Sequence, residues 1–300
     1  MRSTASKKDP ALFPQTPMFE PDQYQLVDFG DARKLERFGL VMLDRPCPAA
    51  DGFRQANPDI WKTATARYDR GDAERGRWTK LAKLPADWTL SHDPFRLGLK
   101  LTPFGHVGVF AEQAVSWDWI ARQAARAARP LRVLNLFAYT GGSSLAAAAV
   151  GCEVTHVDAA NNVVAWARNN AALSGLKDAP IRWIAEDARR FVERELRRGN
   201  SYDAVIVDPP SYGHGPKGEV WKIGNSLAPL LKACGQLTKS RREFILLSCH
   251  SPGFGPAELE AVFSDAIFGH CQGGVIARPL SLVSVDGSKL PCGAVARWPG

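Results

Sequence analysis

Several features that mark familiar protein classes are missing from this 300-residue sequence. Its six cysteines are scattered and form no CxxC pair, so neither a zinc site nor a disulfide framework is expected. No apolar run is long enough to span a bilayer, and the first ten residues contain no apolar stretch of the kind found in secretory signals. These absences predict a cytoplasmic protein with no membrane and no metal partner, and with mostly buried, reduced cysteines.

Acidic residues are also in the minority. The chain has 31 Asp and Glu against 38 Lys and Arg, which gives a formal net charge of +7. This balance suits a polyanionic partner such as RNA, and it equally suits an ordinary solvated basic surface. The length has room for one large domain or two modest ones.

Two common phosphate-binding loops are missing as well. Neither the GxGxxG of dinucleotide enzymes nor a loop that ends in Gly-Lys-Ser/Thr follows the first strand-like run of the main domain. The chain instead reads Asn135-Leu-Phe-Ala-Tyr-Thr-Gly-Gly-Ser143. Gly141 and Gly142 still allow the backbone to approach a ligand at a helix N-terminus. This loop favours a nucleoside cofactor with no phosphate and with a carboxylate-bearing tail.

Apolar strand-like runs alternate with amphipathic segments from about residue 131 onward. Glycine follows three of the predicted helices, where its tolerance of left-handed dihedrals favours a stop. The predicted strands cover 132–138, 153–158, 181–185, 202–207 and 244–248, the predicted helices cover 143–150, 161–174, 188–198, a segment ending near 239 and 256–268, and a loop covers 211–224. This alternation predicts an α/β fold, a parallel sheet with helices on both faces. Two further strands, 275–282 and 293–298, look like a hairpin.

The N-terminal third differs in character. Residues 1–17 are polar and proline-rich, which predicts a loose tail. Residues 18–108 are short-segmented and turn-rich, with strands expected over 39–44 and 95–101, and they predict a small β-rich domain. Trp61, Trp78 and Trp88 are better explained as a small core than as a base-stacking surface. A helix over 112–129 leads into the main domain, 109–300.

Acidic residues end three of the predicted strands, where open parallel sheets bind ligands. Asp158 at the second strand end favours hydrogen bonds to ribose hydroxyls over a merely solvated carboxylate. Asp187 can accept from an adenine amino group, and N-capping of the helix that starts at Ala188 is a strong alternative. Asp208-Pro-Pro leaves the fourth strand as a rigid turn whose polar atoms can point into the cleft.

A cysteine stands at the fifth strand end, beside the fourth in the expected sheet. Cys249 is therefore expected to face the same cleft as Asp208. There a thiolate could add to C6 of a pyrimidine and make C5 nucleophilic. A buried apolar cysteine is the equal alternative. His250 is not assigned as the base, because neighbours on a strand point apart.

These residues resemble the class I S-adenosylmethionine-dependent methyltransferases, and more closely the bacterial 23S rRNA cytosine-C5 methyltransferase family. The matching stretches are Asn135-Leu-Phe-Ala-Tyr-Thr-Gly-Gly, Arg168-Asn-Asn with Gly175 after it, Asp187-Ala188, Asp208-Pro-Pro, Ser248-Cys249 and Gly108-Val-Phe-Ala-Glu-Gln113. The similarity covers about residues 105–270. The chain departs from the family in lacking room for its N-terminal RNA-binding module, and in having Glu112, Ala114 and His250 where Asp, Arg and Ser are usual.

The resemblance implies a Rossmann-like seven-stranded methyltransferase sheet with an antiparallel last strand, plus the small β-rich N-terminal domain. It implies Cys249 as the nucleophile and Asp208 as the residue that holds the base edge. Tyr212, with Pro209 and Pro210, is a candidate for substrate binding, and core packing is an equal explanation for Tyr212. The residues implied to hold S-adenosyl-L-methionine are Gln113, Asn135, Phe137, Tyr139, Thr140, Gly141, Asp158, Asp187, Ala188 and Asp208.

The sequence therefore predicts a methyltransferase that acts on RNA, ribosomal RNA above all, at C5 of cytosine. One alternative is methylation of an amino nitrogen of a nucleobase, or of a protein or small molecule, with Cys249 in a structural role. A non-catalytic RNA-binding module is an alternative of another class, against which the intact loop and acidic strand ends argue. Homo-oligomerisation is left open.

Overall fold

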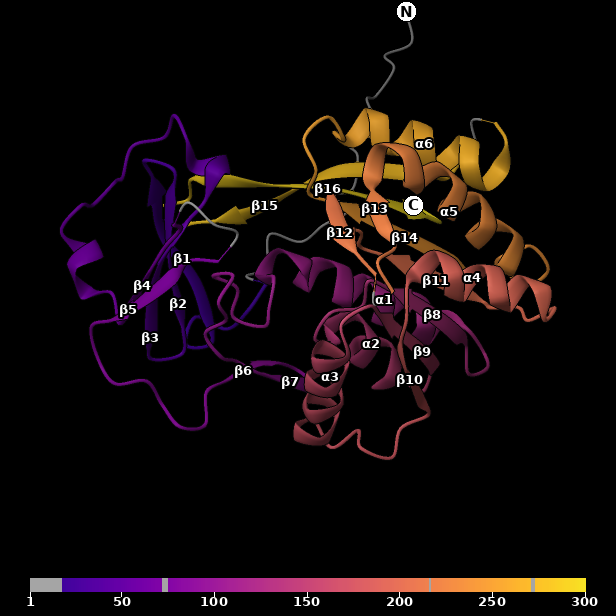
Figure 1. Ribbon diagram of the computed structural model, residues 1–300, viewed down its shortest axis with the longest axis horizontal. Coiled ribbons are helices and arrows are strands. Elements are labelled where there is room, and N and C mark those ends of the chain that lie inside the picture. The colour runs from indigo at the N-terminus through magenta and orange to yellow at the C-terminus, as the bar shows by residue number, and fades with distance from the viewer. Residues whose placement is uncertain (1–17, 72–74, 216, 271–272) are drawn as a thin grey trace, which may run out of the picture.

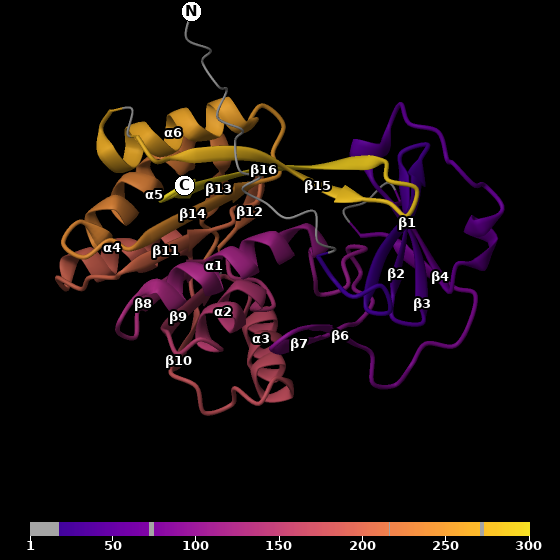
Figure 2. The ribbon, with the colours of Figure 1, turned by 180° about the vertical axis from the view of Figure 1, so that it is seen from behind.

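The computed structural model describes residues 18–71, 75–215, 217–270 and 273–300, so the tail predicted for 1–17 lies outside the described residues. Two parts lie side by side (Figures 1 and 2). A smaller part built from strands holds the N-terminal segments, and a larger part combines helices with a twisted sheet.

The larger part is built on a seven-stranded sheet in the order β10-β9-β8-β11-β14-β16-β15. The first five of these run parallel, and β16 is antiparallel to both β14 and β15. The strands are β8 (Arg132–Leu136), β9 (Glu153–Asp158), β10 (Ile181–Ala185), β11 (Ala204–Val207), β14 (Phe244–Cys249), β15 (Ile276–Val283) and β16 (Lys289–Trp298). The predicted Rossmann-like sheet and terminal hairpin are confirmed, and β11 does lie between β8 and β14.

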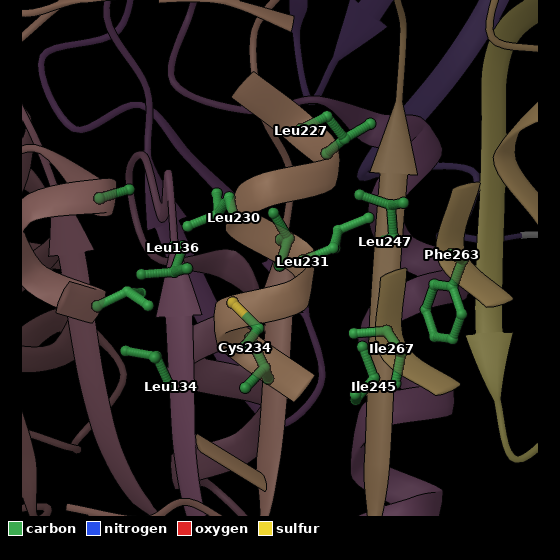
Figure 3. Close-up of a cluster of buried hydrophobic side chains, with 14 of the residues drawn as sticks. Leu134, Leu136, Leu227, Leu230, Leu231, Cys234, Ile245, Leu247, Phe263 and Ile267 are labelled. Carbon is green, nitrogen blue, oxygen red and sulfur yellow. The ribbon is translucent and has the colours of Figure 1, made fainter. Parts of the chain in front are cut away.

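Helices cover both faces of this sheet because its strands are apolar on both sides. They are α1 (Ala114–Arg126), α2 (Gly142–Ala148), α3 (Asn161–Leu173), α4 (Ala188–Arg197), α5 (Ile223–Thr238) and α6 (Pro256–Phe268). On one face, Leu230 and Cys234 of α5 point toward β8, where Leu134 and Leu136 lie, and Leu231 points toward Leu247 of β14 (Figure 3). Val133, next along β8, packs on the other face with α1 and α2. This alternation along one strand is why the central strands read as continuous apolar runs.

Two expected elements differ from the structure in more than their end residues. The loop predicted over 211–224 contains a two-stranded antiparallel ribbon, β12 (Tyr212–His214) with β13 (Val220–Lys222), and α5 starts directly after it. Strands of three residues are too short to produce a period in the sequence. The helix predicted over 112–129 is a 3-10 turn, η3 (Ala111–Gln113), followed by α1, which ends at Arg126 because Ala127 turns to an extended conformation.

The N-terminal part is β-rich, as expected. Its five-stranded sheet has the order β1 (Tyr24–Gly30), β2 (Arg33–Phe38), β3 (Val41–Pro46), β4 (Ala66–Asp69) and β5 (Arg77–Lys80), joined by η1 (Pro48–Ala50) and η2 (Ile60–Thr63) and followed by the ribbon β6 (Thr89–His92) with β7 (Phe95–Gly98). The small-core interpretation of the tryptophans is confirmed. Trp88 is buried in this core, and Trp78 and Trp61 pack against apolar clusters.

The two parts share a continuous apolar core. The β15–β16 hairpin reaches from the large sheet across to the N-terminal strands (Figures 1 and 2), where Val285 N–H donates to Leu26 O at 3.1 Å. Leu282 and Leu290 of this hairpin belong to the same buried cluster as Phe38 and Trp88. Because the two parts share one core, the domain boundary expected at residue 108 stays a prediction. The shared core holds the N-terminal part firmly beside the large sheet.

Candidate active site

A cleft of about 760 Å³ opens at the carboxyl ends of β8, β9, β10 and β11. This is the edge of an open parallel sheet where ligands bind, and the volume is that of a small-molecule site. The cleft brings together eight of the residues expected from the sequence: Phe137, Tyr139, Asp158, Asp187, Ala188, Asp208, Pro209 and Pro210.

The loop after β8 has an unusual backbone. The strand ends at Leu136, two residues before its predicted end, because Phe137 and Tyr139 adopt positive φ values of 55° and 48°. Such conformations are costly for aromatic residues and interrupt a strand ladder. Gly141, at φ 96°, then caps α2, where a residue with a side chain would be strained. The strained backbone therefore lies where this loop lines the cleft.

Four of the expected cofactor residues lie beside the main cleft rather than in it. Gln113, Asn135, Thr140 and Gly141 line a narrow hollow of about 40 Å³ that shares Asp208 with the cleft. Asn135 is buried, and its Nδ2 donates to Ser144 Oγ at 2.9 Å. Thr140 Oγ1 donates to Gly108 O at 2.6 Å. In the structure these two side chains hold the loop in place.

Asp158 ends β9 and lines the cleft. Its Oδ2 accepts the Tyr139 N–H and its Oδ1 accepts the Ala160 N–H, each at 2.9 Å. Burial raises the pKa of this carboxyl, and these backbone donors partly oppose the rise. A carboxylate has about four acceptor positions, so Asp158 keeps the capacity to accept hydroxyl donors from a ligand.

Asp187 caps α4. Its Oδ1 accepts from Arg189 N at 3.0 Å and Arg190 N at 3.1 Å, which confirms the N-cap interpretation. Asp187 and Ala188 also line the cleft. The cap fixes the first turn of α4 at the cleft wall, and its role toward an adenine amino group stays a prediction.

Asp208 is the centre of a polar network at the floor of the cleft. Ser248 Oγ donates to its Oδ1 at 2.6 Å, and Gln113 Nε2 donates to its Oδ2 at 3.1 Å. Gln113 Nε2 also lies 3.1 Å from Ser248 Oγ, so its two hydrogens reach both partners. The carboxylate is thus oriented from two sides by groups on η3 and β14.

His250 completes this network. Its Nε2 lies 3.5 Å from Asp208 Oδ1 and its Nδ1 lies 3.8 Å from Glu112 Oε1. Burial by itself would lower the pKa of His250, but the hydrogen bond and charge of Asp208, with the charge of Glu112, raise it to about 9. At neutral pH the imidazole is therefore a cation between two carboxylates, with a donor on each nitrogen.

Cys249 does not lie where the sequence analysis placed it. Its side chain is fully buried in the apolar cluster with Leu247 and Phe263, and burial raises its thiol pKa. Among the described residues that line the cleft, His250 is present and Cys249 is absent. The expectation that Cys249 faces the cleft is wrong, because the alternation along β14 directs Ser248 and His250 to Asp208 and turns Cys249 to the opposite face.

The Asp208-Pro-Pro turn and β12 form one wall of the cleft. Pro209 and Pro210 line it, and Pro210 O accepts the Trp221 Nε1–H at 2.6 Å. Tyr212 is 51% exposed, so the core-packing explanation for it is wrong, yet it is absent from the described residues of the cleft wall. Its hydroxyl instead meets His214 Nε2 at 3.1 Å.

Sequence reasoning missed several residues that line this cleft. Phe110, His106 and Arg70 come from the segments before α1 and form its outer wall. For His106 and Phe110 the signal available was their position just before Glu112-Gln113, which carries part of the polar network, and for Arg70 the sequence offered no signal. Within the described part of the chain, no group of three or more His, Cys, Asp or Glu side chains is arranged to hold a metal, and no helix is long and apolar enough to cross a membrane.

Three comparisons connect this chain to known proteins. The sequence profile described as S-adenosylmethionine-dependent methyltransferase matches residues 65–243. A crystal structure of an S-adenosylmethionine-dependent methyltransferase from Agrobacterium tumefaciens is 37% identical, with a TM-score of 0.87 over 94% of this chain and 92% of that one. The structure of SMU.776 complexed with SAH shares the fold with a TM-score of 0.72 at 17% identity, over 92% of this chain and 74% of that one.

Curated relatives are longer proteins. The ribosomal RNA large subunit methyltransferase K/L of Shewanella baltica is 27% identical over 208 residues, which is 66% of this chain but only 28% of that protein. The profile match covers more than half of the chain, and it spans the loop after β8, the acidic strand ends and the Asp208-Pro-Pro turn. With the seven-stranded sheet and the cleft at its carboxyl edge, these matches show that the chain belongs to the S-adenosylmethionine-dependent methyltransferase family and is an enzyme that uses this cofactor.

Proposed function

We propose that this enzyme methylates an exocyclic amino nitrogen of a base in RNA, with ribosomal RNA as the substrate class. The observation that carries the proposal is the position of Asp208, a carboxylate held at the cleft floor beside a two-proline turn. The name of the curated relatives, the basic net charge and the burial of Cys249 support it.

The Asp208-Pro-Pro turn offers acceptors to an NH2 group. Ser248, Gln113 and His250 use part of the Asp208 carboxylate, and about four acceptor positions exist on such a group. The carbonyl of Pro210 is already taken by Trp221. The rest of the Asp208 carboxylate and the carbonyl of Pro209, both on residues that line the cleft, are the acceptors that this turn would offer. Two acceptors suit an amino group, which has two hydrogens to donate.

The residues present fit S-adenosylmethionine. When bound, the cofactor supplies an electrophilic methyl carbon on a sulfonium centre. Asp158 lines the cleft with acceptor capacity left for ribose hydroxyls, and Asp187 with Ala188 would contact the adenine. The narrow hollow beside Gln113 and Gly141 adjoins the cleft at Asp208, and it would take the methionine end near the N-terminus of α2.

Residues of this chain would accept the proton that the amino nitrogen loses. As the N–C bond would form and the bond between the methyl carbon and the cofactor sulfur would break, the amino nitrogen would gain positive charge and would have to lose one hydrogen. Asp208, held by Ser248 and Gln113, would accept that proton from the N–H it binds and pass it to water at the cleft mouth. His250 cannot accept it at neutral pH because it is already protonated. It would instead keep Asp208 ionised and oriented. A target base must leave its stack to reach this floor.

The test is methyl transfer to ribosomal RNA prepared from cells that lack this protein, with mass analysis of the nucleosides. Wild type should produce a base methylated on an amino nitrogen. Asp208→Asn should slow transfer by about 100-fold or more, the range for a lost general base, while the enzyme still binds cofactor. Cys249→Ala is the control variant: it changes the residue next to His250 and should keep near-normal activity.

The cytosine-C5 mechanism makes the opposite prediction. It requires the Cys249 thiol to attack C6, so Cys249→Ala would abolish transfer and 5-fluorocytidine RNA would trap a covalent adduct. A 5-methylated pyrimidine as product, together with an inactive Cys249→Ala enzyme, would overturn the amino-nitrogen proposal. Failure to modify any RNA would point to a protein or small-molecule substrate.

A further inference from the structure

A short row of polar side chains lies in the interior of the large part, next to the loop after β8. Asn135 of β8 is the ladder partner of His156 of β9, and Ser144 of α2 contacts both of them. All three side chains are buried. Burying polar groups costs free energy unless they bond to one another, so this row needs a physical explanation.

The hydrogen bonds of the row run in one direction. Asn135 Nδ2 donates to Ser144 Oγ at 2.9 Å, and Ser144 Oγ lies 2.9 Å from His156 Nδ1. A hydroxyl has one hydrogen, and since Asn135 already donates to its oxygen, that hydrogen goes to His156 Nδ1. The imidazole can accept it because burial lowers the pKa of His156 to about 3, which keeps the ring neutral.

The other nitrogen of this imidazole has no such role. His156 Nε2 is buried, and no group of the described residues forms a hydrogen bond with it. The ring packs against Trp183 of β10, with 4.8 Å between the ring centroids. A buried N–H without an acceptor costs free energy that an apolar side chain would avoid. Packing alone therefore does not explain a histidine here, and its contribution lies at Nδ1.

The direction of the row determines which end of the Asn135 amide meets the cofactor hollow. Asn135 lines the hollow of about 40 Å³ that adjoins the cleft. With Nδ2 directed to Ser144, the side-chain oxygen Oδ1 is the atom that Asn135 offers to a ligand there. A hydrogen on His156 Nδ1 would reverse the row, because Ser144 would then accept from His156 and donate to Oδ1. The NH2 group would face the hollow instead.

An acceptor in this hollow suits one end of the cofactor. The amino-acid end of S-adenosylmethionine has an ammonium group, which only donates hydrogen bonds, and an amide NH2 group would repel it. Oδ1 of Asn135 would accept from that ammonium group. Asp208 lines the same hollow and offers further acceptor oxygens.

We propose that His156 is a positioning residue that acts through Ser144 to hold the Asn135 amide with its oxygen toward the ammonium group of S-adenosylmethionine. The inference concerns the cofactor and does not depend on which substrate receives the methyl group. The competing explanation is that the row only fastens α2 to the sheet. A fastening role would affect stability without discriminating between cofactor analogues.

The experiment compares two ligands by isothermal titration. One is S-adenosylhomocysteine, and the other is its analogue in which hydrogen replaces the α-amino group. In His156→Leu the Ser144 hydroxyl loses its acceptor and turns to Asn135 Oδ1. Affinity for S-adenosylhomocysteine should then fall about tenfold or more, as expected for a lost hydrogen bond to a charged group. Affinity for the deamino analogue should change little.

Two further variants serve as controls. His156→Asn places an amide oxygen close to the position of Nδ1 and should restore most of the affinity for S-adenosylhomocysteine. Thr155→Val is the matched polar-to-apolar change at the adjacent buried position of β9, which faces the other side of the sheet. It should leave the affinity for both ligands close to wild type. Melting curves check that each variant is folded.

A double-mutant cycle tests the route through Ser144. Ser144→Ala removes the middle of the row and should produce the same selective loss of affinity for S-adenosylhomocysteine. Adding His156→Leu to Ser144→Ala should lower that affinity no further, because His156 would have no remaining path to Asn135. Losses that add would mean that His156 affects the cofactor site by another route, and the proposal would be wrong.

Other results would also overturn the proposal. One is a folded His156→Leu protein with unchanged affinity for S-adenosylhomocysteine. Another is an equal loss for S-adenosylhomocysteine and the deamino analogue, which would indicate general distortion of the site. If His156→Leu does not fold, Ser144→Ala gives the same comparison between the two ligands. A wild-type enzyme that fails to methylate RNA would overturn the proposed function and leave this inference standing.

Discussion

The ion pair between His250 and Asp208 makes the behaviour of the active site depend on pH in a calculable way. Removing the carboxylate charge by Asp208→Asn eliminates the main group that raises the pKa of His250, and burial then acts to lower it. We expect the His250 pKa to fall from about 9 to the ordinary range near 6.5 or below. The free enzyme should therefore lose the active-site cation at neutral pH.

The size of the effect on stability follows from the same values. The rise in the His250 pKa from 6.5 to about 9 corresponds to a stabilisation of the folded state of about 3.4 kcal/mol before screening, at about 1.4 kcal/mol per pKa unit. The His250 side chain is 34% exposed, so solvent screening reduces this to about 1–2 kcal/mol. Since the folded pKa is the higher one, the stabilisation is complete below about pH 6.5 and is lost as pH rises through 9.

Two measurements check this reasoning. NMR titration of histidine ring protons should place His250 near 9 in wild type and lower by about two units or more in Asp208→Asn. Melting temperatures of wild type and His250→Asn should differ by about 2–5 °C at pH 6 and converge by pH 10. His214→Asn, a change on β12 outside the network, is the matched control.

Two results would refute the argument. A wild-type His250 that titrates at or below 6.5 would mean that the paired geometry with Asp208 and Glu112 is not kept in solution. A His250 that still titrates near 9 in Asp208→Asn would mean that Glu112 alone holds the proton, and Glu112→Gln would then be the variant to examine.

Two further predictions concern the cofactor and the scaffold. Asp158→Ala removes the acceptors expected to bind ribose, so isothermal titration should show at least tenfold weaker S-adenosylmethionine binding with a nearly unchanged melting temperature; unchanged affinity would remove Asp158 from the site. Asp203 is fully buried and accepts from Arg129 at 2.7 Å, Arg241 at 2.5 Å and Arg132 N at 2.6 Å. Asp203→Ala should therefore cost about 2–3 kcal/mol in urea unfolding, against about 0.5 kcal/mol or less for Glu153→Ala at an exposed strand position. Equal losses of unfolding free energy in both variants would contradict the stabilising role of the buried Asp203 hydrogen bonds.

Much of the main domain was readable from the sequence because its signals are local. The strands β9 and β10 and the helix α6 have the predicted bounds, since apolar runs, acidic strand ends and glycine or proline punctuation act over a few residues. The order of these elements determined the sheet, and the sheet determined that Asp158, Asp187 and Asp208 lie along one edge.

Only the tertiary structure decided which face of β14 meets the cleft. Ser248, Cys249 and His250 are consecutive, and alternation says that the middle one points away from the other two, but not which side holds the ligand. That choice depends on α5 and α6, whose apolar side chains enclose Cys249. It also depends on Gln113 and Asp208, which contact Ser248 and His250 on the other side.

The outer wall of the cleft is the second feature that the sequence alone did not contain. Arg70 and His106 reach the cleft because a shared core and the long β15–β16 hairpin hold the N-terminal strands beside the large sheet. Such contacts join residues far apart in the chain, and their free energy depends on packing that no local pattern encodes. The sequence by itself thus determined the fold and its cofactor edge, and long-range packing decided which side chains face the cleft.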